Sequence, residues 1–351
     1  MKMLEEMLRE RKLPAVFTGE QTWETRRVEL LEMLCREEYG FLPPLPQSMQ
    51  FEILETNERY CAGKATYQKI RLQMTFPTGE FAFPFYAVIP NKPGKYPFFV
   101  HINFRDNVPD RYMPTEEICD NGFAVFSFCY RDVTSDDGDF STGLAGVLAC
   151  DPAKDCGKIA FWAYAASRVM DYAQTLSCLD FTRAAVAGHS RLGKTALLAG
   201  ALDTRFTAAF SNESGCSGAA LSRGGNEKRE TVGHICGEFP FWFCRRYQQY
   251  AGAEDTLPFD QHFLLACMAP RRVYVSSAAA DLWADPVSEY LSCVAAGKVY
   301  RQLGLSGFVC PDRLPQVGDV FAAGRIGYHL RAGTHYFSRE DWLHFMEFLK
   351  I

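Results

Sequence analysis

Residues 184–200 read AAVAGHSRLGKTALLAG. A short apolar run ends at Gly188, Ser190 follows it, and good helix formers begin immediately afterwards. This order predicts a buried strand, a sharp turn and a helix, with the Ser190 hydroxyl exposed at the tip of the turn. Because such a turn strains the serine backbone, its neighbours must be small, and Gly188 and Gly193 meet that requirement. The N–H groups at the start of the helix would stabilise a negatively charged oxygen beside the serine.

The pattern departs at one position from the common G-x-S-x-G sequence of serine hydrolases. Leu192 stands where the second glycine belongs, and Gly193 comes one residue later. Taken alone, the pattern also fits an ordinary connection between a strand and a helix. The hypothesis that Ser190 is a nucleophile therefore depends on suitable partner residues elsewhere in the chain.

Strand and helix patterns alternate through most of the chain, which predicts a doubly wound, mostly parallel α/β sheet. Continuous apolar runs predict strands covered on both faces, whereas three earlier runs look like antiparallel edge strands. The expected central strands are 97–103, 123–130, 181–187, 206–210, 272–277 and 326–330, and the edge strands are 49–55, 65–76 and 81–89. The expected helices are 20–39, 114–121, 157–176, 260–268, 286–303 and 339–351. We therefore expect one three-layer catalytic domain over 1–351 with the α/β-hydrolase fold, with 1–45 packed on it as a helical extension.

The composition limits the kinds of partner. The 351 residues carry a net charge of −5, so no basic face for nucleic acid is expected. Residues 1–12 are charged and lack the apolar region of a signal peptide, and no apolar run is long enough to span a membrane. We expect a cytoplasmic protein, or a secreted one if a leader peptide has been removed. The sequence leaves the oligomeric state open.

The thirteen cysteines are scattered and form no C-x-x-C pair. Several of them, namely Cys129, Cys150, Cys267 and Cys293, lie inside apolar runs. This distribution predicts reduced, buried thiols and neither a disulfide framework nor a metal site. Cys216, in a glycine-rich stretch, is expected to be a small packed residue.

A nucleophilic serine needs a base, which is usually a histidine held by a carboxylate. In hydrolases of this fold the order along the chain is serine, acid, histidine. Of the seven histidines, His335 is the best placed, because it follows the last expected strand and precedes the last helix. His329 lies within that strand and His344 on the helix, where packing roles are expected.

Two carboxylates are candidates for the acid. Asp281 follows the strand at 272–277, where this fold usually places its acid, and Glu213 follows the strand after the nucleophile. Asp285 instead resembles a helix N-cap, since Pro286 comes next. We slightly prefer Asp281, although both carboxylates could face His335 and share the role.

Two basic residues follow the serine. The backbone N–H of Arg191 can serve an oxyanion hole, and its guanidinium could add positive charge there. Lys194, one turn further, could reach a substrate hydroxyl or carboxyl group. A solvated side chain is the alternative for each of them.

Together these segments resemble the glucuronoyl esterases of carbohydrate esterase family 15, and in particular its bacterial members. GHSRLGK at 188–194 is similar to the family signature G-C-S-R-x-G-K, with histidine at the cysteine position as in bacterial members. NESG at 212–215, ADLWADP at 280–286, RAGTH at 331–335 and FPFWF at 239–243 resemble further family segments, with Phe241 replacing a histidine in the last of them. The resemblance spans most of the chain after about residue 97.

The resemblance implies a carboxylic ester hydrolase similar to 4-O-methyl-glucuronoyl methylesterase, acting on uronic acid esters of xylan or lignin–carbohydrate material. It implies that Ser190, His335 and Asp281 or Glu213 form the catalytic set and that Arg191 holds the oxyanion. It further implies that Lys194, Glu230 and Glu238 bind sugar hydroxyls and that Trp283 lines the sugar site. No metal or organic cofactor is expected. The alternatives are an acetyl-xylan or other small-ester esterase with the same residues, and a carbohydrate-binding relative without activity.

Overall fold

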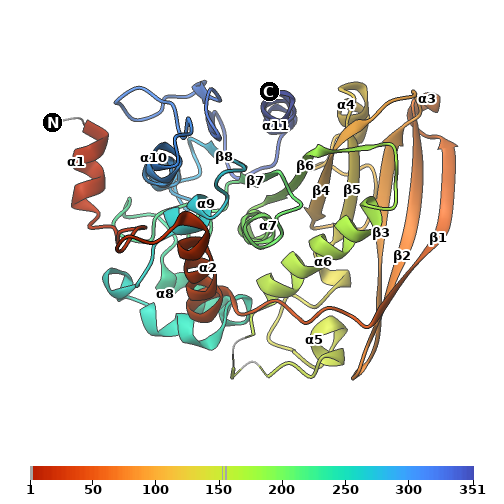
Figure 1. The fold of residues 1–351 in the computed structure, drawn as a ribbon, viewed down its shortest axis with the longest axis horizontal. Helices are drawn as coiled ribbons and strands as arrows, with labels where there is room; N and C mark the ends of the chain where they lie inside the picture. Colours follow the sequence, from red (N-terminus) through yellow and green to blue (C-terminus); the bar gives the residue numbers. More distant parts are fainter. Residues whose placement is uncertain (1–2, 152, 155) are drawn as a thin grey trace.

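A twisted ten-stranded sheet runs through the molecule in the order β1-β2-β3-β5-β4-β6-β7-β8-β10-β9 (Figure 1). The computed structural model describes residues 3–151, 153–154 and 156–351. The strands are β1 (Ser48–Arg59), β2 (Ala65–Phe76), β3 (Gly79–Pro90), β4 (Tyr96–Asn103), β5 (Ala124–Cys129), β6 (Leu179–His189), β7 (Ala208–Asn212), β8 (Arg272–Ala278), β9 (Val320–Phe321) and β10 (Ile326–Arg331). β5, β4, β6, β7, β8 and β10 are parallel to their neighbours in this series, whereas β1, β2 and β3 form an antiparallel edge.

Helices cover both faces of the sheet and complete three layers (Figure 1). One face carries α4 (Thr115–Asp120) and α11 (Arg339–Lys350). The other carries α6 (Lys158–Ala173), α7 (Arg191–Leu202), α9 (His262–Ala266) and α10 (Pro286–Gln302). All residues of β4 and β5 are buried, as the continuous apolar runs require for strands between two helical layers. The predicted fold class is confirmed.

The chain before the sheet packs against the layer that contains α9 and α10. α1 (Met3–Glu10) places Leu4 and Leu8 in the core, and α2 (Trp23–Leu34) continues into a π-helical turn, Cys35–Tyr39. The Trp23 indole N–H donates to the carbonyl of Ala269 at 3.2 Å. The helical spacing of Val28, Leu31 and Leu34 predicts that all three are buried. Leu31 and Leu34 are buried, but the prediction is wrong for Val28, which is 62% exposed because the buried stripe of α2 runs through Trp23, Leu30 and Leu34.

Several further helices and turns are short, and the sequence patterns do not predict them. They are α3 (Tyr60–Gly63), α5 (Gly143–Val147), α8 (Val232–Glu238) and the 3₁₀ turns Tyr130–Asp132, Pro240–Trp242, Arg245–Tyr250 and Glu254–Thr256. α5 and α8 lie in or at the end of the stretches 131–158 and 214–237, whose glycine and polar residues predict loops. They cover the end of the sheet at which the parallel strands terminate.

The prediction of reduced cysteines is wrong for Cys150, which forms a disulfide with Cys156. The chain turns back after α5 and brings the two Cα atoms to 6.6 Å, a separation that a disulfide can span. Only the path of this loop reveals the pair, since the spacing has no characteristic pattern. Cys129, Cys267, Cys293 and Cys216 are buried thiols, as expected.

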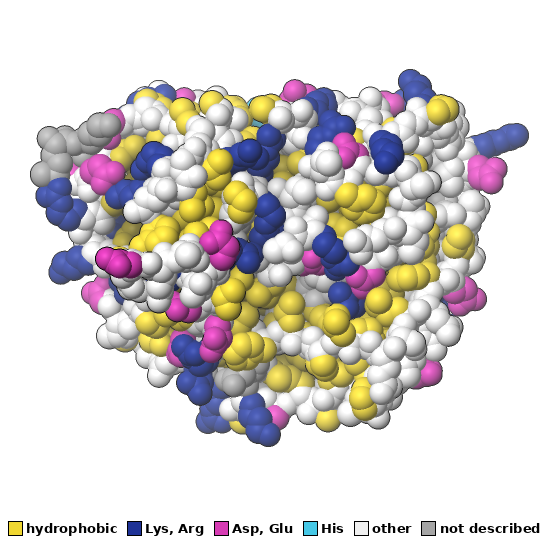
Figure 2. Space-filling view, in the orientation of Figure 1, with side chains coloured by type: hydrophobic (Ala, Val, Ile, Leu, Met, Phe, Trp, Pro, Cys, Tyr) yellow, Lys and Arg dark blue, Asp and Glu magenta, His cyan; other side chains and the backbone are white. Residues whose placement is uncertain are grey.

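The surface carries both signs of charge. On the face shown in Figure 2, lysine and arginine side chains are interspersed with aspartate and glutamate side chains. Within the described residues, no helix combines the length and the apolar character that a membrane span requires.

Candidate active site

Ser190 occupies the turn between β6 and α7 with a backbone that ordinary residues avoid. Its φ is 58° and its ψ is −128°, and its N–H donates to the carbonyl of Asn212 at 2.8 Å. A Cβ atom on Gly188 would lie 2.0 Å from the carbonyl oxygen of Leu192, so only glycine permits the helix to start this close to the strand. The turn therefore has the strained geometry and small neighbour that the sequence predicts.

Ser190 and His335 line one cavity of about 350 Å³. The residues that share its wall are Phe104, Arg105, Arg111, Tyr112, Tyr130, Arg131, His189 and Arg191. Ser190 and Arg191 come from the β6–α7 turn, and His335 comes from the loop after β10. These carboxyl ends of neighbouring parallel strands are where open α/β sheets bind ligands.

His335 faces two carboxylates at once. Its Nδ1 lies 2.6 Å from Oδ2 of Asp281 and 3.2 Å from Oε2 of Glu213. Asp281 comes from the loop after β8, and Glu213, with a φ of 45°, comes directly after β7. The structure thus brings both candidate acids to the same imidazole nitrogen and does not choose between them.

The charges around His335 shift its pKa. Burial disfavours the imidazolium, but the hydrogen bonds to Asp281 and Glu213 outweigh it and raise the pKa of His335 to about 9. Burial raises the pKa of the Glu213 carboxyl to about 7, against the opposing influence of His335 and Arg331. The His335 imidazole and the Glu213 carboxyl therefore each influence the proton affinity of the other.

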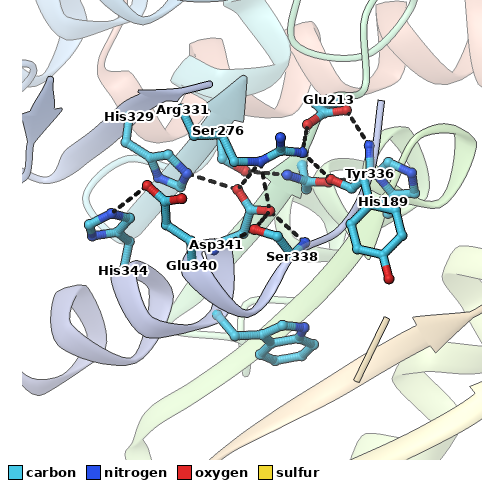
Figure 3. Close-up of polar contacts among 12 residues, drawn as sticks. His189, Glu213, Ser276, His329, Arg331, Tyr336, Ser338, Glu340, Asp341 and His344 are labelled. Atoms are coloured by element: carbon cyan, nitrogen blue, oxygen red, sulfur yellow. Dashed lines mark hydrogen bonds and ion pairs between the residues drawn. The ribbon is translucent and has the colours of Figure 1, made fainter. Parts of the chain in front are cut away.

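Glu213 is fixed by two further donors, drawn in Figure 3. Arg331 donates from Nη2 to Oε1 of Glu213, and the backbone N–H of Tyr336 donates to Oε2 at 2.9 Å. Both donors come from the end of β10 and the loop that follows, the same segment that carries His335. The loop and the carboxylate therefore hold each other in place.

His189 precedes the serine and presents a neutral ring to the cavity. Asn212 donates from Nδ2 to Oγ of Ser276 at 2.8 Å, so its oxygen accepts the N–H at Nδ1 of His189 at 2.6 Å. This assignment leaves Nε2 of His189 with its lone pair. Burial and the nearby His335, whose ring centroid is 4.4 Å away, lower the pKa of His189 well below its usual value.

Arg191 follows the serine directly and is held by a different group of residues. Its Nη1 donates to Asp136, and its guanidinium lies 4.5 Å from the ring centroid of Trp242 and 5.7 Å from that of Phe104. Asp136 also accepts the Trp242 indole N–H and the Tyr130 hydroxyl, each at 2.7 Å. No sequence pattern indicates Asp136 or Trp242 as partners of Arg191, because both lie in irregular segments far from Ser190 in the chain.

Three of the four residues expected at the sugar site, namely Lys194, Glu230 and Trp283, form a separate group. Lys194 is 3% exposed, and its Nζ donates to the carbonyl of Ser214 at 2.5 Å and lies 3.7 Å from Oε2 of Glu230. The N–H of Glu230 donates to the carbonyl of Trp283, whose ring is 51% exposed. Glu238 lies exposed at the end of α8. Among the described residues, the wall of the Ser190 cavity includes none of these four.

Within the part of the chain that the structure describes, one group of side chains has the spacing to hold a metal ion. His189, Glu213 and His335 place atoms that can act as ligands within 4.8 Å of one another. Each of the three side chains already takes part in the hydrogen bonds described above.

Comparisons with known proteins agree with this architecture. The family model for fungal glucuronyl esterases matches residues 75–304. The chain belongs to the glucuronoyl esterase family. It is 44% identical over 241 residues to a carbohydrate esterase from an unknown prokaryotic organism, covering 66% of this chain and 54% of the relative. It is 28% identical over 297 residues to the 4-O-methyl-glucuronoyl methylesterase of Podospora anserina, covering 82% of this chain and 58% of that enzyme.

Solved structures of this family share the fold along nearly the whole chain. A glucuronoyl esterase from Solibacter usitatus superimposes with a TM-score of 0.85 at 30% identity, covering 96% of this chain and 97% of that one. A promiscuous family 15 esterase from a marine bacterial metagenome gives a TM-score of 0.84 at 32% identity, covering 97% and 95%. The predicted family is therefore confirmed, whereas this chain spans little more than half of the first curated relatives it matches.

Proposed function

We propose that this protein is a serine esterase that hydrolyses glucuronoyl esters of xylan-derived saccharides. The observation that carries the proposal is the convergence of Ser190 and His335 on one cavity, with the imidazole held by Asp281 and Glu213. Family membership supports the uronic acid ester as the substrate, because curated relatives are named 4-O-methyl-glucuronoyl methylesterases.

The proposed reaction begins with attack by the Ser190 hydroxyl oxygen on the ester carbonyl carbon. His335 takes the hydroxyl proton, and the two carboxylates stabilise the imidazolium that forms. The backbone N–H and the guanidinium of Arg191 stabilise the oxyanion of the tetrahedral intermediate. The intermediate collapses, His335 protonates the departing alcohol, and the uronic acid stays attached to Ser190 as an ester.

Water completes the proposed cycle. His335 removes a proton from the water, whose oxygen attacks the acyl carbon, and the second intermediate releases the uronic acid and restores the Ser190 hydroxyl. In this scheme Lys194, Glu230, Glu238 and Trp283 contact the sugar, and a small carbohydrate ester is the partner. This contribution requires substrate to extend from the Ser190 cavity toward the exposed Trp283 ring.

An ester panel tests the proposal. We expect wild-type protein to hydrolyse benzyl glucuronate and to react with a fluorophosphonate probe, and Ser190→Ala to do neither. Faster turnover of an acetylated xylose derivative than of benzyl glucuronate would favour the small-ester alternative. Sugar binding without any turnover or labelling would contradict the proposed esterase function and favour a carbohydrate-binding protein without activity.

A further inference from the structure

Arg331 joins two buried carboxylates without reaching the cavity. It is the last residue of β10, is 5% exposed and is not part of the cavity wall. Its Nε lies 3.2 Å from Oδ2 of Asp341 on α11, and its Nη2 donates to Oε1 of Glu213 (Figure 3). A buried cation that contacts two carboxylates offsets part of the desolvation cost of burying each of them.

The same guanidinium also fixes the backbone that carries His335. Nη2 donates to the carbonyls of Thr334, at 3.2 Å, and Tyr336, and Nη1 donates to that of Ala332 at 2.9 Å. These carbonyls flank His335 on both sides. A planar guanidinium has five N–H groups on three nitrogens and can serve all these acceptors at once if two of the three acceptors at Nη2 share one N–H, whereas a lysine ammonium has only three donors at one point.

Asp341 is itself held rigidly at the start of α11. It accepts from Nε2 of His329 at 2.8 Å and from the N–H and hydroxyl of Ser338, each at 2.7 Å. Burial disfavours its charge, but the hydrogen bond from His329 and the charges of His329 and Arg331 lower the pKa of Asp341 below its usual value. His329 in turn contacts the Tyr274 hydroxyl at 3.1 Å and the ring of His344, with centroids 4.5 Å apart.

We propose that Arg331, anchored by Asp341, is a positioning residue that holds the Glu213 carboxylate and the His335 loop in their reactive arrangement. The inference rests on the proposed esterase function. It explains why a glutamate buried beneath the loop still presents a carboxylate oxygen to Nδ1 of His335. Arg331 acts through Glu213 and the loop and does not touch the substrate.

Arg331→Met and Arg331→Lys test this role, because a positioning residue should affect kcat and leave KM unchanged. We expect Arg331→Met to lower kcat about 100-fold, the scale of a small misplacement of a catalytic group, with KM unchanged. Arg331→Lys should lower kcat less than Arg331→Met does, since lysine keeps the positive charge but lacks the planar set of N–H donors. The matched control is Arg339→Met, which removes an arginine that is 76% exposed in its side chain and paired with Glu117 at 3.0 Å, and which should behave as wild type.

A double-mutant cycle tests the coupling to Glu213. In a Glu213→Gln background, Arg331→Met should lower kcat less than it does in wild type, because the carboxylate that it serves is gone. Equal losses in both backgrounds would overturn the proposal. An unchanged kcat in Arg331→Met that retains the wild-type melting temperature would also overturn it.

Proton NMR of the His335 Nδ1–H provides a readout that does not depend on turnover. The low-field resonance of this proton should move in Arg331→Met and Arg331→Lys and stay unchanged in Arg339→Met. If Arg331→Met does not fold, Arg331→Lys decides: a wild-type resonance and kcat would overturn the proposal, and a moved resonance with lowered kcat would support it. Absence of esterase activity in wild type, by contrast, would refute the proposed function and leave the NMR comparison valid.

Discussion

The two sides of Ser190 are held in different ways. On one side, which we call the acid side, His335 contacts both Asp281 and Glu213. Arg331 in turn contacts Glu213 and Asp341. On the other, which we call the oxyanion side after the role that we propose for Arg191, this arginine is held by one carboxylate, Asp136, within a group of aromatic rings.

The difference lies in redundancy. A carboxylate lost from the acid side leaves a second one at the same imidazole nitrogen. On the oxyanion side no other guanidinium among the described residues contacts both Asp136 and Trp242 as Arg191 does. Loss of one of the two carboxylates should therefore be tolerated better than loss of Arg191, and this contrast is open to experiment.

The largest effect is expected when both acids are removed. Asp281→Asn combined with Glu213→Gln should lower kcat/KM by ~10⁴-fold, as removal of the acid does in other serine hydrolases. Each single variant should lose far less, since the remaining carboxylate still orients His335. Steady-state kinetics on benzyl glucuronate provide the measurement, and a single variant as inactive as the double would show that one acid works alone.

The oxyanion side should respond strongly to one substitution. Arg191→Met is expected to lower kcat ~10²–10³-fold, the range for loss of an oxyanion donor. Arg131→Met is the matched control, because Arg131 borders the same cavity but has a side chain that is 65% exposed and lies over Tyr130. A kcat for Arg191→Met within a few-fold of the control would remove the contrast between the two sides.

The pH profile sharpens the comparison further. His335 must be neutral to accept a proton, so kcat/KM should fall as the pH drops below the pKa of His335. Because that pKa is raised, the midpoint of this acidic limb should lie above the usual value near 6.5. Asp281→Asn removes the stronger stabiliser of the imidazolium, so the limb should move to lower pH by ~1–3 units. Arg191→Met should leave the limb in place, and a limb that moves equally in both variants would contradict the assignment.

The smallest effect is expected away from the chemistry. Trp283→Ala should raise KM a few-fold, about 1 kcal/mol, by removing an exposed ring that we expect to stack on the sugar. Trp283→Phe keeps an aromatic face and serves as the control. A change in kcat instead of KM would place Trp283 nearer the reacting atoms than we propose.

Much of this arrangement could be expected from local patterns. The buried strands, the turn at Ser190 and the place of His335 after the last strand all follow from apolar runs and turn residues close together in the chain. The choice between Asp281 and Glu213 could not be predicted from such patterns, because it depends on how far β7 and β8 lie from β10 and on the rotation of each side chain. The sequence left both carboxylates open, and the structure places both at His335.

Long-range pairings were beyond the reach of these patterns. Asp136 lies in a loop with several aspartates, where nothing marks one as the partner of Arg191. Arg331 and Glu213 are 118 residues apart, and only the sheet order brings them together. The Cys150–Cys156 disulfide was missed for the related reason that its loop has no regular pattern.

The backbone of Ser190 has a consequence for how this protein can change over time. A non-glycine residue at a φ of 58° and ψ of −128° costs of order 1–3 kcal/mol of folding free energy. Glycine adopts that conformation without steric penalty, so a chain with glycine there would be catalytically silent yet harder to melt. A screen for thermal stability alone would therefore favour glycine at position 190, at the expense of the hydroxyl on which the proposed activity depends.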